Sequence, residues 1–120
     1  MTAALTTEQL RQAASKLPRV PLAHLPTPLE DALRFARKFE GPRVLIKRDD
    51  STGIVMGGNK TRHNEFLMGE APKQKADVLV WGAGVQSNNC RQTAAACNKL
   101  GLRTILVLEG ARPNDPQGNL

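Results

Sequence analysis

A lysine directly behind a glycine turn is the residue of this chain best suited to covalent chemistry. The run Gly57-Gly58-Asn59-Lys60-Thr61-Arg62 puts Lys60 at the expected start of a helix. Glycines carry no Cβ and let the backbone approach a flat ligand closely. The positive end of the helix dipole disfavours the charged ammonium form of a lysine, and a neutral amine can form a Schiff base with an aldehyde cofactor. An exposed lysine after an ordinary turn is the alternative.

A second run that could bind an anion follows further along the chain, Gly82-Ala83-Gly84-Val85-Gln86-Ser87-Asn88-Asn89. The apolar segment before it, Asp77–Trp81, is typical of a buried strand, and the alanine-rich Cys90–Cys97 after it is typical of a helix. Ser87 is a good N-cap, and the free N–H groups of a first helical turn can bind a substrate carboxylate. Loops at the carboxyl ends of parallel strands often bind ligands. An ordinary capped helix is the alternative.

Together these runs resemble one family. Gly57–Arg62, Gly84–Asn88 and the following Arg91-Gln92-Thr93-Ala94-Ala95 are similar to the D-cysteine desulfhydrase and 1-aminocyclopropane-1-carboxylate (ACC) deaminase family. Its members are pyridoxal-phosphate (PLP) enzymes with a tryptophan-synthase-β-like fold of type II. The resemblance runs from about Pro26 to about Glu109. It implies an α/β fold with a parallel sheet in a three-layer αβα arrangement, of which this chain supplies the N-terminal part.

The resemblance implies a set of residues that bind the cofactor. Lys60 would hold PLP through a Schiff base and move the α-proton of the substrate. Asn59 and Gly58 would shape the turn beneath the cofactor ring, and Asn88 would hydrogen-bond the ring oxygen. His63 stands where relatives usually have a second lysine near the cofactor phosphate, and we expect it to be a packed or capped residue rather than a catalyst.

The resemblance also implies a substrate site at the start of the second helix. Ser87, Asn88 and Asn89 would bind the substrate, and Ser87 would lie close enough to take part in catalysis. Asn89 stands where relatives often have histidine or glutamine, a difference that bears on substrate identity. No metal site is expected.

The expected activity is that of a PLP-dependent lyase or deaminase acting on a small amino acid. Conversion of D-cysteine to pyruvate, sulfide and ammonia is the first choice, ACC deamination is the second, and another β-elimination is the third. The alternative from another class is an inactive fragment, or a non-catalytic subunit that needs a partner chain. Residues that recognise the substrate side chain are expected beyond Leu120.

The length and charge of the chain bound these expectations. It has 120 residues and 13.0 kDa, whereas family members are much longer, so we expect the phosphate-binding loop and the pyridine-nitrogen partner in a later part. The net charge is +6 and the isoelectric point is near 9.9. Because the basic residues are scattered, without zinc-ligand spacing or an aromatic stacking pair, they favour a solvated surface or attraction of anionic ligands over nucleic-acid binding.

The two cysteines and the hydropathy predict a cytoplasmic enzyme, and we expect the longer chain to form a homo-oligomer, namely a dimer. Cys90 and Cys97 lie on one expected helix, and their Cα atoms would be about 10 Å apart, too far for a disulfide. Both are expected to be packed small hydrophobes, with a reactive Cys90 as the lesser alternative. Neither a signal peptide nor a membrane-spanning run is apparent, so no membrane partner is expected.

Local signals divide the chain into residues 1–26, a helix and a proline-rich arm, and residues 27–120, the N-terminal part of the PLP domain. Thr6 and Gln9 have capping-box spacing for the first helix, and Thr27 with Pro28 predicts the start of a second helix that ends at Gly41. Charged residues 47–50 are expected to form a turn or local ion pairs rather than catalytic acids. From the strand at 44–46 onward, the order β-α-β-α-β predicts parallel strands joined by right-handed crossovers. The predicted helices are 8–17, 28–40, 60–70 and 88–100, the strands are 44–46, 78–81 and 104–108, and 111–120 is a loop.

Overall fold

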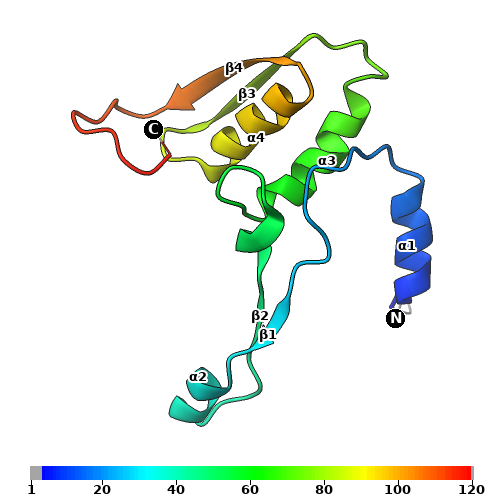
Figure 1. Ribbon diagram of the computed structural model, residues 1–120, viewed down its shortest axis with the longest axis vertical. Coiled ribbons are helices and arrows are strands. Elements are labelled where there is room, and N and C mark those ends of the chain that lie inside the picture. The colour runs from blue at the N-terminus through cyan, green and yellow to red at the C-terminus, as the bar shows by residue number, and fades with distance from the viewer. Residues whose placement is uncertain (1–3, 120) are drawn as a thin grey trace.

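The structure, a computed structural model, describes residues 4–119; residues 1–3 and Leu120, the ends of the two predicted units, lie outside this part. Figure 1 shows α3 and α4 beside the strands β3 and β4, with the β1–β2 ribbon and α2 extending away from them. The elements are α1 (Thr7–Ser15), β1 (Leu29–Asp31), α2 (Leu33–Lys38), β2 (Leu45–Lys47), the 3-10 helix η1 (Asp49–Thr52), α3 (Lys60–Glu70), β3 (Val78–Gly84), α4 (Asn88–Lys99) and β4 (Arg103–Glu109).

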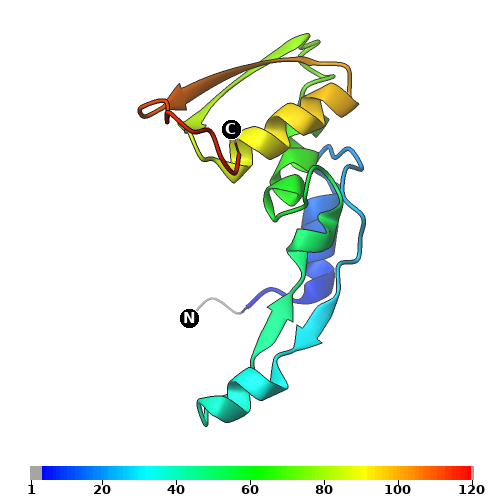
Figure 2. The same cartoon turned by 60° about the vertical axis from the view of Figure 1, so that its left-hand side comes forward.

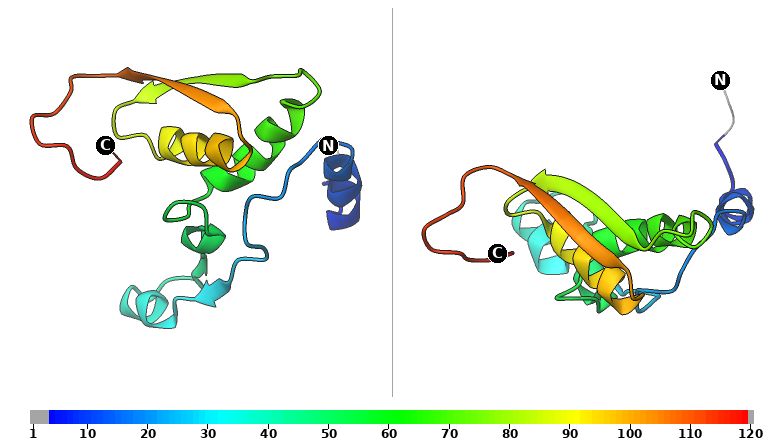
Figure 3. Two further views of the ribbon diagram at one scale, coloured as in Figure 1. Left: turned by 45° about the horizontal axis from the view of Figure 1, so that its top comes forward. Right: turned by 90° about the horizontal axis from the view of Figure 1, so that it is seen from above.

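The centre of the fold is a β–α–β unit. Strands β3 and β4 pair in parallel, from Val78 opposite Arg103 to Gly84 opposite Glu109, and α4 makes the crossover between them. Helix α4 packs against both strands and α3 packs against α4. Figure 3 shows α4 lying across one face of this sheet. The parallel pair and both helices therefore confirm the predicted α/β arrangement over residues 60–109.

The strand at residues 45–47 corrects one detail of the predicted sheet. We expected it to join the later strands in parallel, but β2 pairs antiparallel with β1 in a separate two-stranded ribbon. Figure 2 shows this ribbon leading away from α3 and α4 toward α2. In the described part of the chain, the parallel sheet consequently has two strands, and helices cover one of its faces.

The predicted helix start at Thr27 is wrong. Residues 29–31 form strand β1, and the helix begins only at Leu33. The Thr27 hydroxyl donates to Asp49 Oδ1 at 2.9 Å and accepts from Arg62 Nη2 at 2.9 Å, so it does not cap a helix. Because both partners are distant in sequence, tertiary contacts override the local capping signal here.

The first helix is capped as predicted but stands apart from the core. Thr6 Oγ1 accepts from Gln9 N, and Gln9 Oε1 accepts from Thr6 N, which completes the predicted capping box. None of the nine residues of α1 is buried. Its apolar side chains, such as Leu10 at 52% exposure, therefore face solvent in the described part of the chain.

The core is small and lies where α3, α4 and the proline arm (residues 18–26) meet. Its buried apolar residues are Leu22, Met68, Ala96 and Cys97. Cys90 and Cys97 are both buried and free, as predicted. The radius of gyration is 17.9 Å, against about 14 Å for a compact domain of this length, because the ribbon and α1 extend outward. Among the described residues, no helix has both the length and the apolar character to cross a membrane.

Glu65 of α3 fastens the proline arm to the core. Its buried carboxylate accepts hydrogen bonds from the backbone N–H groups of Leu22 at 2.9 Å and Ala23 at 2.8 Å, and it forms an ion pair with Arg19. The arm crosses α3 at Gly69, where an added Cβ would lie 2.4 Å from the Pro18 carbonyl oxygen. The arm is thus held by the Glu65 carboxylate, and the missing side chain at Gly69 lets the arm backbone lie close against α3.

The ionised form of Glu65 stabilises this arrangement. Burial alone raises the pKa of the Glu65 carboxyl, but the hydrogen bonds from Ala23, Leu22 and Arg19 outweigh it and hold the pKa below its usual value. A carboxyl whose pKa is lowered by folding contributes stability above its unfolded pKa, and the contribution is lost as the pH falls through the folded pKa.

We expect Glu65→Gln to lower the free energy of unfolding of the full-length protein by about 2 kcal/mol at pH 7, because hydrogen bonds to a charged acceptor are lost. The difference from wild type should shrink as the pH falls below the usual range for glutamate. Chemical denaturation at several pH values measures both effects. Glu70→Gln, on the same helix but half exposed in its side chain, is the matched control and should be nearly neutral. Equal effects of the two variants would contradict this role of Glu65.

Candidate functional site

The two sequence runs meet because α3 and α4 point in the same direction. Buried side-chain pairs join the helices in step from their first turns to their last. These pairs are Thr61–Gln92 with an Oγ1–Oε1 distance of 2.9 Å, Asn64–Thr93 with an Oδ1–Oγ1 distance of 3.2 Å, and Met68–Cys97 with an Sδ–Sγ distance of 4.0 Å. The two helix N-termini, which carry partial positive charge, therefore lie at the same end of the interface.

Lys60 is the first residue of α3, as the sequence predicts. Its side chain is half-buried and has no hydrogen-bond or ion-pair partner among residues 4–119. Asn59 precedes it at the N-cap position, but the Asn59 side chain makes no capping hydrogen bond. The amine of Lys60 is therefore available to a ligand at the helix N-terminus.

Two glycines shape the turn before Lys60, as predicted, and the protein itself crowds both of them. Gly57 and Gly58 have φ values of 66° and 129°, a region that other residues rarely adopt. A Cβ on Gly57 would lie 1.7 Å from the Asp50 carbonyl oxygen, and one on Gly58 would lie 2.4 Å from Gln92 Nε2. Glycine is thus required both for the backbone conformation and for close contact with η1 and α4.

The end of the preceding ribbon anchors this turn through Asp49. The Asp49 backbone oxygen accepts from Gly58 N at 2.8 Å, and Thr52 Oγ1 also accepts from Gly58 N at 2.9 Å. Arg62 donates to both carboxylate oxygens of Asp49, at 2.9 and 2.8 Å. The hydrogen bonds from Arg62, opposed in part by burial, lower the pKa of Asp49 to about 2. Asp49 is thus in an ion pair, as predicted for this charged segment.

Asp50 is in an ion pair as well, and so belongs to the same structural cluster. Arg48 bonds to Asp50 and to Glu30 of β1, at 2.6 and 2.9 Å. These contacts join the ribbon to η1 immediately before the lysine loop. Of the charged residues 47–50, residues 48–50 thus form ion pairs, one of the two predicted outcomes, while Lys47 donates to the Thr27 carbonyl oxygen.

Ser87 caps α4, as predicted. Its Oγ accepts from the backbone N–H groups of Asn89 and Cys90, each at 3.2 Å, which leaves the hydroxyl hydrogen able to donate. The side chain of Asn89 lies along its own helix, with Oδ1 3.4 Å from Thr93 Oγ1. Asn88 is the exposed first residue of α4, and its Oδ1 accepts from Asn119 Nδ2 at 2.8 Å.

The structure brings the predicted site residues together at one end of the helix pair, and it adds three that the sequence reasoning missed. The side chain of Gln92 lies against the backbone of Gly58, while Arg91 and Asn119 contact Asn88. Arg91 and Gln92 stand inside the quoted run Arg91–Ala95, which could have drawn attention to them. Asn119 stands in a loop with no local signal.

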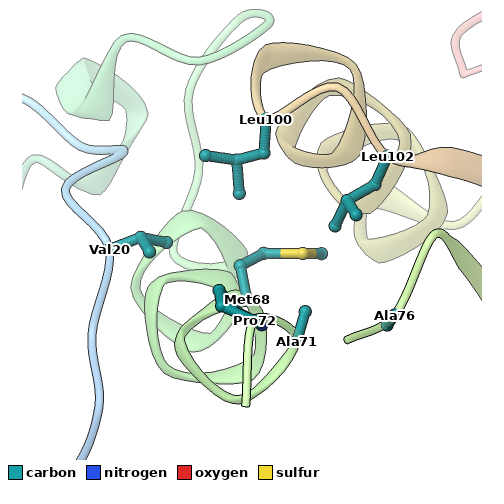
Figure 4. A pocket seen from close by; sticks show the side chains of 7 residues that line it. All are labelled: Val20, Met68, Ala71, Pro72, Ala76, Leu100 and Leu102. Atoms are coloured by element: carbon teal, nitrogen blue, oxygen red, sulfur yellow. The ribbon is translucent and has the colours of Figure 1, made fainter. Parts of the chain in front are cut away.

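Two other features lie outside this cluster. His63 packs against Trp81 of β3 in a tilted arrangement, with ring centroids 5.7 Å apart and the ring planes at 54°, consistent with a packing role. An apolar pocket of about 200 Å³ opens near the opposite ends of α3 and α4, and Figure 4 shows aliphatic side chains around it. The lining residues are Val20, Met68, Ala71, Pro72, Ala76, Leu100 and Leu102. This lining offers no side chain for acid–base or nucleophilic chemistry.

The cluster fits an anionic aldehyde cofactor. Among residues 4–119, neither the amine of Lys60 nor the Nδ2 group of Asn88 has a hydrogen-bond partner, and Asn88 Oδ1 accepts from Asn119. The converging helix N-termini favour negative charge. This combination of a covalent anchor, a neutral donor and a positive field suits PLP and the carboxylate of an amino acid.

We expect Gly57→Ala to lower the free energy of unfolding by about 3 kcal/mol or more, because the new methyl group meets a backbone oxygen as well as an unfavourable φ. Gly101→Ala is the matched control: Gly101 has a similar φ of 72°, but nothing lies within 4 Å of an added Cβ. It should cost about 1 kcal/mol. Thermal or chemical denaturation of both variants gives the comparison. Similar losses would show that crowding at Asp50 does not constrain the loop.

Comparisons with known proteins identify the family of this chain. The family model of pyridoxal-phosphate dependent enzymes matches residues 20–119. The chain is 46% identical over 95 residues to D-cysteine desulfhydrase of Salmonella paratyphi A, covering 79% of this chain and 29% of the relative. It is 45% identical over 108 residues to D-cysteine desulfhydrase of Serratia proteamaculans, covering 90% and 32%.

A solved structure supports the same family at the level of the fold. The crystal structure of an ACC deaminase homologue superposes with a TM-score of 0.82 at 40% identity, over 88% of this chain and 32% of that one. The chain thus spans about a third of the length of the proteins it matches. The predicted resemblance, the α/β class of a fold-type II enzyme and the PLP cofactor are confirmed. The chain belongs to the family of pyridoxal-phosphate-dependent enzymes.

Proposed function

We propose that the full-length protein is a PLP-dependent lyase acting on a small amino acid, with D-cysteine as the preferred substrate. The observation that carries the proposal is that Lys60 and Ser87–Asn89 stand at the starts of α3 and α4, whose first turns are joined by the Thr61–Gln92 hydrogen bond. The D-cysteine desulfhydrases at 45–46% identity support this choice of substrate. ACC deamination is the second candidate, supported by the similar structure of an ACC deaminase homologue.

One group of residues in this chain serves the cofactor and another group binds the substrate. PLP, when bound, supplies an electron sink that stabilises negative charge at the substrate Cα. Lys60 would hold the cofactor covalently and would move a proton at Cα. Asn88 would help to hold the cofactor by donating from Nδ2 to its ring oxygen, while Gly58 and Asn59 would shape the turn beneath the ring.

The start of α4 positions the substrate. Its free N–H groups, with the side chains of Ser87, Asn88 and Asn89, bind the carboxylate and thereby fix which bond at Cα faces the cofactor. The Ser87 hydroxyl, whose hydrogen is not used in capping, can donate to the substrate and take part in proton transfer. Loss of sulfide from D-cysteine would leave an enamine, and its hydrolysis by one water molecule would then give pyruvate and ammonia.

We also propose how this chain is organised within the longer enzyme. Residues 1–26 are the unit that contains α1 and the proline arm, and residues 27–120 are the N-terminal part of the PLP domain, with the Glu65 contacts joining the two. The two free cysteines support a reducing, cytoplasmic location. The family resemblance supports a homodimer of the longer enzyme. It also supports small amino acids as the substrates, and neither nucleic acid nor a membrane as a binding partner.

Lys60→Ala in the full-length protein should abolish the cofactor adduct that borohydride reduction traps, and with it sulfide release from D-cysteine. Mass spectrometry of the digested, reduced protein locates the adduct. Lys73→Ala, at an exposed lysine after α3, is the control and should retain both. An adduct on Lys47 or Lys73 would show that the lysine is assigned wrongly. A colourless wild-type protein that forms no adduct would favour the non-catalytic alternative.

Ser87 variants separate capping from substrate binding. We expect Ser87→Ala to lower kcat/KM by about 10- to 150-fold, because a hydrogen bond to a charged group is lost. Ser87→Gly should be as damaging to kcat/KM, although glycine is tolerated at an N-cap at a cost of only a few tenths of a kcal/mol. Asn89→Ala should also lower kcat/KM. Steady-state kinetics with D-cysteine, beside the cofactor absorbance, provide the measurement. Near-normal kinetics in Ser87→Gly would limit Ser87 to a capping role.

A further inference from the structure

The loop that leads to Lys60 holds an unfavourable backbone conformation. Three consecutive residues have positive φ values: Val55 at 36°, Met56 at 58° and Gly57 at 66°. For a β-branched residue such as valine this region is a true outlier, so surrounding contacts must maintain it. Val55 and Met56 are themselves exposed and gain little from burial. The constraint must therefore come from hydrogen bonds to the loop backbone.

One guanidinium group supplies hydrogen bonds to both ends of this loop. Arg91, half-buried in the first turn of α4, donates from Nη1 to the Val55 carbonyl oxygen and from Nη2 to the Gly57 carbonyl oxygen, the latter at 3.4 Å. These oxygens flank Met56, so Arg91 ties the strained segment to the helix that carries Ser87. The lysine loop is thereby fixed relative to α4.

The same guanidinium also orients the side chain of Asn88. Arg91 Nη2 lies 3.4 Å from Asn88 Oδ1, and Arg91 Nε donates to Asn119 Oδ1 at 2.7 Å. Asn119 in turn donates to Asn88 Oδ1 at 2.8 Å and to the Gln86 carbonyl oxygen at 2.7 Å. Figure 1 shows the last described segment returning to the start of α4. Because a guanidinium only donates, the oxygen of Asn88 must face Arg91, and its Nδ2 group faces away.

We propose that Arg91 is a positioning residue, which sets the lysine loop and the Asn88 amide in register with one another for cofactor binding, with Asn119 as its second support. The inference rests on the proposed function, because it assigns Asn88 Nδ2 to the ring oxygen of PLP. Arg91 acts through Lys60 and Asn88 and does not itself touch the cofactor. Lysine at this position keeps the charge but lacks the planar set of donors that reaches several acceptors at once.

The test compares Arg91→Lys with wild type in the full-length protein, using two properties of the bound cofactor. One is the dissociation constant of PLP, measured by titrating the cofactor-free protein. The other is the pH midpoint of the cofactor's visible absorbance. A hydrogen bond donated to an oxygen lowers its affinity for protons, so loss of orientation at Asn88 should raise that midpoint. We expect PLP binding to weaken about tenfold or more, with an upward shift in the midpoint.

Three further variants make the outcome specific. Asn119→Ala should shift the midpoint in the same direction, and it carries the test if Arg91→Lys does not fold. In an Asn88→Ala background, Arg91→Lys should cause no further shift of the midpoint, because both changes act on one group. Arg103→Lys, at an exposed arginine paired with Asp77, is the matched control and should behave like wild type.

Two results would overturn the inference and can be told apart. If wild type shows a Lys60-dependent visible band, but Arg91→Lys and Asn119→Ala change only the thermal midpoint of unfolding, then Arg91 is a structural link and the proposed function stands. If wild type shows no Lys60-dependent band, then the proposed function fails and this inference fails with it.

Discussion

The interface between α3 and α4 is the contact on which the rest of this structure depends. Its character changes along its length: Met68 and Cys97 form an apolar contact at one end, while Thr61 and Gln92 form a buried hydrogen bond at the other. Apolar packing alone would tolerate small shifts of one helix along the other. A buried hydrogen bond does not, because a slip would leave polar groups unpaired. The polar end therefore fixes the register of the two helices, and both candidate site segments begin there.

Two arginines, one from each helix, hold the loop before Lys60. Arg62, in the first turn of α3, binds the carboxylate of Asp49, and the backbone oxygen of Asp49 in turn accepts from Gly58. Arg91, from α4, bonds to the loop backbone at Val55 and Gly57. Each guanidinium bridges several acceptors, which a lysine cannot do with comparable geometry. The loop can therefore keep its positive φ values without an extensive apolar core beneath it.

Sequence reasoning succeeded where a structural signal is local and failed where it depends on distant partners. The helix start at Lys60, the Ser87 cap and the Thr6–Gln9 capping box each rely on a few neighbouring residues, and the structure has all three. Thr27 carries an equally clear capping signal, but its hydroxyl bonds to Asp49 and Arg62 instead. The antiparallel pairing of β2 with β1, and the contacts of Arg91 with Asn119, join segments far apart in the chain. No spacing rule within one segment could reveal them.

The central claim is that the α3–α4 pairing makes one cofactor site out of two separate segments. Hydrogen–deuterium exchange of the full-length protein, with and without PLP, tests this directly. The account predicts that amides of residues 58–62 and 87–91 gain protection together, at the same PLP concentration, while those of α1 do not change. Protection confined to one of the two segments, or appearing at clearly different PLP concentrations, would contradict a shared site.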